Sequence, residues 1–225
     1  MNESTESSLG LFTSIIKFVQ DGGPFMYLIM AVFAVGIAIS IERFIYLQNV
    51  RRQNRDMWEK IFPLLDQGLG DKALQLAKHS DATIAKIVRY GLERSVYAQY
   101  HTEIELAMEE GLMEAIPQLE RRTPYLATFA NIATLLGLLG TILGLISAFT
   151  AVASADPSQK ADLLSASISV AMNTTAFGLM TAIPLLLVFS ILQSTTAQII
   201  DSMEMASVKL MNTFHKAQNI KSDGS

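Results

Sequence analysis

Three long runs of the sequence contain no charged residue, and they limit what the chain can fold into. They cover residues 24–41, 123–155 and 163–200. A helix needs about 20 apolar residues, with roughly 17 as the lower limit, to cross the hydrocarbon core of a bilayer. The first run meets this limit and the other two exceed it. We therefore predict an all-α polytopic membrane protein with three transmembrane helices.

The composition excludes several other classes of protein. Half of the residues are hydrophobic and 17% are charged, whereas a typical soluble domain has about 25% charged residues. The net charge of -4 argues against a nucleic-acid partner, which a basic surface would recognise. The absence of cysteine excludes a disulfide scaffold, Cys-ligated zinc and iron–sulfur clusters. We expect no cofactor and no metal site.

The distribution of lysine and arginine predicts the orientation, because cytoplasmic loops are enriched in these residues. Most of them lie between the first and second runs, whereas only Lys17 precedes the first run and only Lys160 separates the last two. The middle segment and the C-terminal tail are therefore expected in the cytoplasm. Arg43, at the cytoplasmic end of the first run, is expected to snorkel toward water.

These patterns divide the chain into seven predicted segments. They are an N-terminal interfacial segment (1–23), the first transmembrane helix (24–47), a cytoplasmic helical segment (48–123), the second transmembrane helix (124–154), a turn on the far side (155–162), the third transmembrane helix (163–196), and a cytoplasmic C-terminal helix and tail (197–225). Residues 9–19 are amphipathic, which fits either an interfacial helix or a soluble amphipathic turn.

The cytoplasmic segment has helical periodicity that is interrupted at Gly68 and Gly70. Helices are expected over residues 53–65, 71–79, 81–95 and 102–119. The last of these carries several glutamates on one side, which indicates a solvated helix face and not a metal site.

Polar and small residues inside the second run follow a helical pattern. Asn131, Thr134 and Thr141 share one face. Beside them, Gly137, Gly140 and Gly144 form a smooth groove, and a small-xxx-small pair of this kind lets two helix backbones approach closely.

The third run carries a stripe of small and hydroxylic residues. Its members are Ser167, Ala171, Thr174, Gly178 and Thr181, with Asn173 and Thr175 beside them. Burying an unpaired hydroxyl or amide costs roughly 1–3 kcal/mol, so this stripe is expected to face protein or water and not lipid. Pro184 is expected to kink the helix.

No ionisable side chain lies within the second or third run. If the protein conducts cations, its own two helices offer only neutral oxygen atoms, which cannot bind and release a proton near neutral pH. A carboxylate would then have to come from the transmembrane helix of a partner.

Two of these segments resemble a known family. The sequences ANIATLLGLLGTILGLISAF (130–149) and NTTAFGLMTAIP (173–184) are similar to the signature of the MotA/TolQ/ExbB family, and so is the Glu42-Arg43-Phe44 sequence. The order of one span, a long cytoplasmic segment and two further spans fits the ExbB and TolQ branch better than MotA, which has four spans.

The resemblance implies an ion-conducting subunit of a motor complex in the bacterial inner membrane, and not an enzyme. Five copies would enclose two copies of a single-span partner similar to ExbD or TolR, whose transmembrane aspartate carries the ion. Ion flow would drive a TonB-like periplasmic transducer for outer-membrane transport or envelope maintenance. By motif match, Thr141 and Thr175 correspond to the family's pore-facing threonines.

The candidate site residues form two sets. The expected ion pathway comprises Thr134, Thr141, Asn173, Thr174, Thr175 and Thr181. The expected helix-packing residues are Gly137, Gly140, Gly144, Gly178 and Pro184.

The sequence departs from the family at Val170, where many members have glutamate, and at Thr134, where many have proline. The missing glutamate leaves both proton and sodium open as the coupling ion, because hard cations such as sodium accept neutral oxygen ligands. The same spans also fit a flagellar-type stator or a non-conducting membrane scaffold. An intramembrane enzyme is disfavoured, because His79, His101 and His215 all lie outside the three runs.

Overall fold

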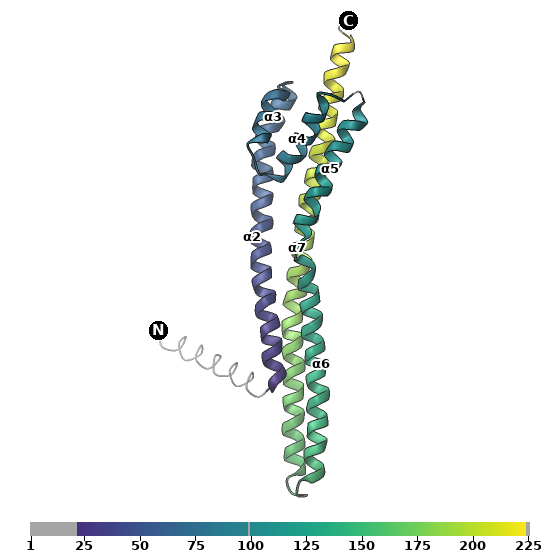
Figure 1. Ribbon diagram of the computed structural model, residues 1–225. Helices are drawn as coiled ribbons and strands as arrows, with labels where there is room; N and C mark the ends of the chain where they lie inside the picture. Colours follow the sequence, from purple (N-terminus) through teal and green to yellow (C-terminus); the bar gives the residue numbers. More distant parts are fainter. Residues whose placement is uncertain (1–21, 99, 224–225) are drawn as a thin grey trace, which may run out of the picture. The chain divides into compact units, whose positions relative to one another are not determined.

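The computed structural model describes residues 22–98 and 100–223, with the backbone alone for residues 215–223 (Figure 1). This part of the chain is helical and contains no strand. Its helices are α2 (Pro24–Asp66), α3 (Gly70–Lys78), α4 (Thr83–Ser95), α5 (His101–Glu120), α6 (Thr123–Ser154) and α7 (Lys160–Asp223). The all-α prediction is confirmed. The expected amphipathic segment at residues 9–19 lies outside the described residues.

Three helical stretches are long and apolar enough to cross a membrane: Pro24–Asp66, His101–Ser154 and Lys160–Phe214. Their most apolar windows have mean hydropathies of 2.3, 2.2 and 2.2, yet only 17%, 22% and 28% of each window is buried within the protein. Such extensive exposed apolar surface requires lipid or neighbouring subunits to cover it. The prediction of three membrane-spanning helices is confirmed at the level of length and hydropathy, and the chain is a multi-pass membrane protein.

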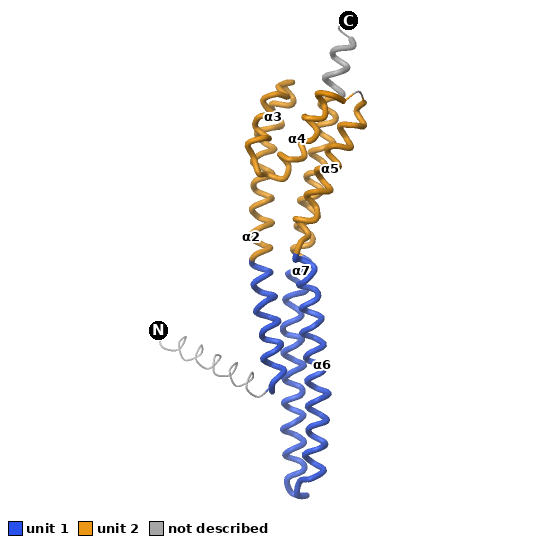
Figure 2. Tube along the Cα trace, in the orientation of Figure 1, with its two compact units in different colours: residues 1–41, 122–190 blue, residues 42–121, 191–225 orange. Residues whose placement is uncertain are grey.

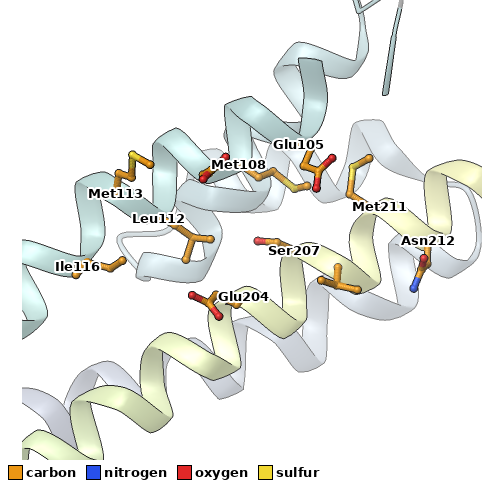
Figure 3. A pocket seen from close by; sticks show the side chains of 11 residues that line it. Glu105, Met108, Leu112, Met113, Ile116, Glu204, Ser207, Met211 and Asn212 are labelled. Atoms are coloured by element: carbon orange, nitrogen blue, oxygen red, sulfur yellow. The ribbon is translucent and has the colours of Figure 1, made fainter. Parts of the chain in front are cut away.

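The chain forms two compact units (Figure 2). The first combines Met1–Ile41 with Arg122–Ser190, and the second combines Glu42–Arg121 with Ile191–Ser225. Helices α2 and α7 therefore contribute to both units, whereas α6 belongs to the first and α3, α4 and α5 belong to the second.

The first unit consists of the beginning of α2, all of α6 and the beginning of α7. Helix α2 packs closely on α7, because a Cβ atom on Gly36 would lie only 2.7 Å from Cδ2 of Leu185. The N-terminal end of α2 lies beside the middle of this part of α7, where Gly23 is next to Val170. Helices α6 and α7 continue past this point to the turn that joins them (Figure 2).

In the second unit, the side chain of Arg43 differs from the sequence prediction. Arg43 was expected to snorkel, but its side chain is 3% exposed, and its guanidinium donates hydrogen bonds to the backbone oxygens of Gln118 (3.4 Å) and Leu119. The last carbonyls of a helix lack intrahelical donors and carry partial negative charge. Arg43 satisfies those of α5, and its guanidinium also lies 4.5 Å from the ring of Tyr46.

Another polar side chain of α2 supports the beginning of α4. Asn54 is buried, and its Oδ1 accepts a hydrogen bond of 3.1 Å from the backbone N–H of Ile84. The N-cap residue Ala82 supplies no side-chain cap. Asn54 therefore replaces the local capping side chain that α4 lacks.

The helix bounds differ from the sequence prediction in one respect. The first span and the helix expected over residues 53–65 form one continuous helix, α2, which ends before Gly68 with its φ of +73°. The expected continuation of the third span into the C-terminal helix is present in α7, where Pro184 lies inside an uninterrupted helix. The kink at Pro184 stays a prediction.

Candidate ion pathway

Small residues bring α6 and α7 into close backbone contact. A Cβ atom on Gly137 would lie 3.2 Å from Cα of Thr175, and one on Gly178 would lie 2.7 Å from the backbone oxygen of Ala133. Real Cβ atoms essentially never approach a neighbour below 3.0 Å. The two helices can therefore adopt this spacing only because glycine occupies position 178.

The close approach brings two threonine hydroxyls together. Oγ1 of Thr141 on α6 and Oγ1 of Thr175 on α7 are in hydrogen-bond contact. The backbone oxygen of Gly137 is a second acceptor for both hydroxyls, at 3.1 Å from Thr141 and 2.9 Å from Thr175, so two protons are shared among three contacts. Both side chains are half-buried, so this cluster lies at the edge of the helix pair within the first unit.

The cluster can offer neutral oxygen ligands. A carbonyl oxygen has two lone pairs and can accept from both hydroxyls, while each hydroxyl oxygen keeps lone pairs of its own. When both protons point at Gly137, the lone pairs of Thr141 and Thr175 are free to meet a cation or an external donor. No charged residue lies in residues 123–155 or 163–200, so the site has no proton-binding group of its own.

Thr174 occupies a different environment from its neighbour Thr175. It is 2% exposed, and its hydroxyl lies 2.6 Å from the backbone oxygen of Gly22 and 2.9 Å from that of Val170. Since a hydroxyl has one proton, these two carbonyls share it. Thr174 therefore ties the beginning of α2 to α7 and is enclosed by the protomer itself.

The remaining members of the expected ion pathway differ in exposure and in hydrogen bonding. Thr181 is 1% exposed, and its hydroxyl has no hydrogen-bond partner among the described residues. Thr134 is exposed and donates to the backbone oxygen of Ala130 at 3.1 Å, within its own helix. Asn173 is half-buried. The structure thus brings Thr141 and Thr175 into contact, whereas the hydrogen bonds of Thr134 and Thr174 go to other acceptors; the pathway role of all six stays a prediction.

A small cavity lies where α2 begins. It has a volume of about 260 Å³, and its lining residues include Gly22, Gly144, Ser147, Ser167 and Val170. Val170 supplies an apolar wall here.

Sequence reasoning missed two participants in this region, the carbonyls of Gly22 and Gly137. Every residue has a backbone carbonyl, so no residue pattern marks those that accept side-chain hydrogen bonds. Within the described part of the chain, no group of three or more His, Asp or Glu side chains converges on a metal position.

The sequence also matches a family model. The model of the MotA/TolQ/ExbB proton channel family matches residues 79–205, which is more than half of the chain and includes Thr141 and Thr175. The chain belongs to this family.

Individual relatives agree with this assignment. The chain is 26% identical to an ExbB homolog of Methanothermobacter thermautotrophicus, over 96% of this chain and 76% of the relative. It is 30% identical to the biopolymer transport protein ExbB-like 1 of Synechocystis sp., over 80% and 71% of the two chains. The Tol-Pal system protein TolQ of Haemophilus influenzae is 35% identical over 37% of this chain and 36% of its own. These relatives identify the ExbB/TolQ branch.

Proposed function

We propose that this protein is the ion-conducting inner-membrane subunit of an ExbB/TolQ-type motor complex. The observation that carries the proposal is the meeting of Thr141 and Thr175 at the Gly137 carbonyl. Two hydroxyls at this half-buried edge present neutral oxygens to whatever lies next to the helix pair. In a family of ion channels, such a pair lines the ion path.

The proposal requires a carboxylate from another polypeptide. Residues 123–155 and 163–200 contain no ionisable side chain, and neutral hydroxyls cannot carry a proton on and off. A single-span partner similar to ExbD or TolR supplies a transmembrane aspartate. The apolar surface left exposed on all three spans fits a closed ring of copies of this chain, five in number, around two such partners.

The orientation follows the positive residues. The N-terminus and the turn at 155–162 lie in the periplasm, whereas residues 48–123 and 197–225 lie in the cytoplasm. Ion flow turns one component of the complex against the other, and a TonB-like periplasmic transducer receives the work. The relatives' names, biopolymer transport and Tol-Pal system, favour outer-membrane transport or envelope maintenance as the process that is energised.

Removing one hydroxyl tests the proposal. Thr175→Val and Thr141→Val keep the side-chain shape and delete the oxygen, so each is expected to lower ion-driven activity of the reconstituted complex at least tenfold while assembly is retained. Thr150→Val is the matched control, because Thr150 also lies on α6 and bonds only its own helix, through the oxygen of Ile146 at 2.9 Å. Full activity of Thr175→Val in an intact complex contradicts the proposal.

The coupling ion is decided by a separate measurement. We propose the proton as the coupling ion, with sodium as the alternative that the hydroxyl-rich, acid-free site also suits. Activity is measured with and without sodium at a fixed proton gradient. A proton-driven complex is indifferent to sodium, whereas loss of activity on sodium removal establishes sodium as the coupling ion.

A non-conducting scaffold is the second candidate function, and the glycine contacts between α6 and α7 favour it. A scaffold needs the shape of these helices and not the oxygen of Thr175. The scaffold therefore predicts unchanged function in Thr175→Val together with loss of assembly when Gly178 is enlarged.

A further inference from the structure

A second cavity lies in the second unit, between the latter part of α2, the beginning of α4 and the latter part of α7. It has a volume of about 270 Å³. Its polar lining residues are Arg51, Asn54 and Arg55 from α2 and Gln198 and Ser202 from α7. No acidic side chain is among the residues that line it, so it is a basic cavity with apolar walls from Trp58, Ile84 and Ile199.

Asn54, one of the residues that line this cavity, has an unused donor that the surrounding atoms cover. Its side chain is 4% exposed, and its Oδ1 is engaged with the backbone N–H of Ile84 at 3.1 Å. This bond fixes the amide orientation, because only the oxygen can accept from an N–H. The Nδ2 atom, which has two hydrogens, finds no acceptor among the described residues. Buried donors are nearly always satisfied, so an acceptor from outside the chain is expected here.

The surroundings favour an acceptor that is negatively charged. Helix α4 has thirteen residues and begins at Thr83 beside the cavity, without a side-chain cap from its N-cap residue. The N–H groups of Ile84, Ala85 and Lys86 have acceptors within the chain, so α4 contributes the positive end of its dipole, which attracts anions. Arg51 forms no ion pair within the part of the chain that the structure describes, whereas Arg55 lies 3.9 Å from both Asp56 and Glu59.

We propose that this cavity binds a phosphate group, with the Arg51 guanidinium and the Asn54 amide as its donors. Arginine suits this ligand because its planar fork matches the phosphate oxygens. The phosphate belongs either to the headgroup of an anionic phospholipid or to a soluble phosphate. The lipid source rests on the proposed orientation, since Arg51 follows Arg43 by eight residues of α2, or about 12 Å of helical rise, on the cytoplasmic side where anionic lipids and basic pockets meet.

The chain contains its own reporter for this cavity. Trp58 is the one tryptophan in the sequence, and it lines the cavity. The full chain is purified in dodecyl maltoside, and its tryptophan emission is followed during titration with mixed micelles of phosphatidylglycerol, with mixed micelles of phosphatidylcholine, and with inorganic phosphate. A saturable change in emission is expected with phosphatidylglycerol and none with phosphatidylcholine.

Two variants are designed to remove the donors while the hydrogen bond that supports α4 is retained. Arg51→Gln deletes the charge. Asn54→Asp keeps an oxygen for the N–H of Ile84 and replaces the free amide with a carboxylate, so the cap of α4 is retained and the phosphate is repelled. Each is expected to weaken the response about tenfold or more, as the loss of a charge-assisted hydrogen bond does. Arg52→Gln is the matched control, because Arg52 is outside the lining of the cavity and its side chain is 81% exposed.

Each outcome of the titrations either supports or overturns the proposed phosphate site. A response to inorganic phosphate that is lost in Arg51→Gln, without one to phosphatidylglycerol, supports the site and assigns it to a soluble ligand. An equal response to phosphatidylcholine, an equal loss in Arg51→Gln and Arg52→Gln, or no response to any of the three probes overturns the proposal. Melting temperatures of the variants, compared with that of the unaltered chain, separate lost binding from lost structure.

Discussion

Individual glycines determine how closely the membrane helices pack, and two of them differ in what surrounds them. A Cβ atom on Gly178 would lie 2.7 Å from the backbone oxygen of Ala133, whereas one on Gly36 would lie 2.7 Å from a terminal methyl of Leu185. A backbone oxygen in a helix cannot move without shifting the helix, but a leucine side chain can change its rotamer.

We therefore expect Gly178→Ala to destabilise the protein by about 1–3 kcal/mol through overpacking, and Gly36→Ala to have a much smaller effect. Thermal unfolding of the two purified variants in the same detergent measures the difference. Equal melting temperatures for both would mean that α6 and α7 separate easily, against the contact geometry described above.

At the residue scale, the sequence predicts the packing face of α6 but not the pairing of side chains between helices. The three- and four-residue spacing of Gly137, Gly140 and Gly144 predicts one smooth face on α6, and in the structure these positions lie against α7. The pairing of Thr141 with Thr175 depends on the register between two helices, which no pattern within one helix specifies. Only the resemblance to the family assigns these two residues to one pore.

At the scale of elements, polar side chains of α2 hold the ends of other helices. Arg43 binds the last carbonyls of α5, and Asn54 accepts from one N–H of the first turn of α4, that of Ile84. Hydrophobic periodicity predicts that these helices exist and roughly where they end. It does not indicate that their termini are completed by residues about 30 to 76 positions away.

Replacing Arg43 with methionine tests this role. Arg43→Met keeps the apolar stem and removes the guanidinium, so the carbonyls of Gln118 and Leu119 lose their donors. A buried polar group left unsatisfied costs about 1–3 kcal/mol, and faster hydrogen exchange is expected in the last turn of α5. In Arg52→Gln, which removes an exposed ion pair 3.9 Å long, the change is expected to stay below about 0.5 kcal/mol. Unchanged exchange in Arg43→Met would contradict the capping role.

At the scale of the whole molecule, helix α6 is longer than the hydrocarbon core of a bilayer is thick. Helix α6 has 32 residues, or about 48 Å at 1.5 Å per residue, whereas the hydrocarbon core is about 30 Å thick. Even a tilt of 40° leaves a depth of about 37 Å. Since α2 begins beside Val170, ten residues after α7 starts, the ends of α6 and α7 at the turn that joins them extend past the beginning of α2 (Figure 2). The absence of charge from residues 123–155 and 163–200 does not indicate where along these helices the hydrocarbon core ends.

The absence of cysteine makes this arrangement testable with single-cysteine variants and a membrane-impermeant maleimide on right-side-out spheroplasts. Ser158→Cys, in the exposed turn between α6 and α7, is expected to react at once, and so is Ala151→Cys in the end of α6 next to this turn. Leu135→Cys, deeper on the same helix, is expected to stay unlabelled because lipid covers it. Gln67→Cys, between α2 and α3, is expected to react only after lysis.

Labelling all four positions distinguishes a reversed orientation of the chain from a deeper position of α6 in the bilayer, which a single position could not do. Labelling of Gln67→Cys in intact spheroplasts, with Ser158→Cys protected until lysis, would reverse the orientation that the positive residues predict. Equal protection of Ala151→Cys and Leu135→Cys, with Ser158→Cys still reactive, would leave the orientation intact and place all of α6 within the bilayer. A helix of this length does not fit the hydrocarbon core at any common tilt. We therefore expect labelling to decrease along α6 from Ala151→Cys to Leu135→Cys.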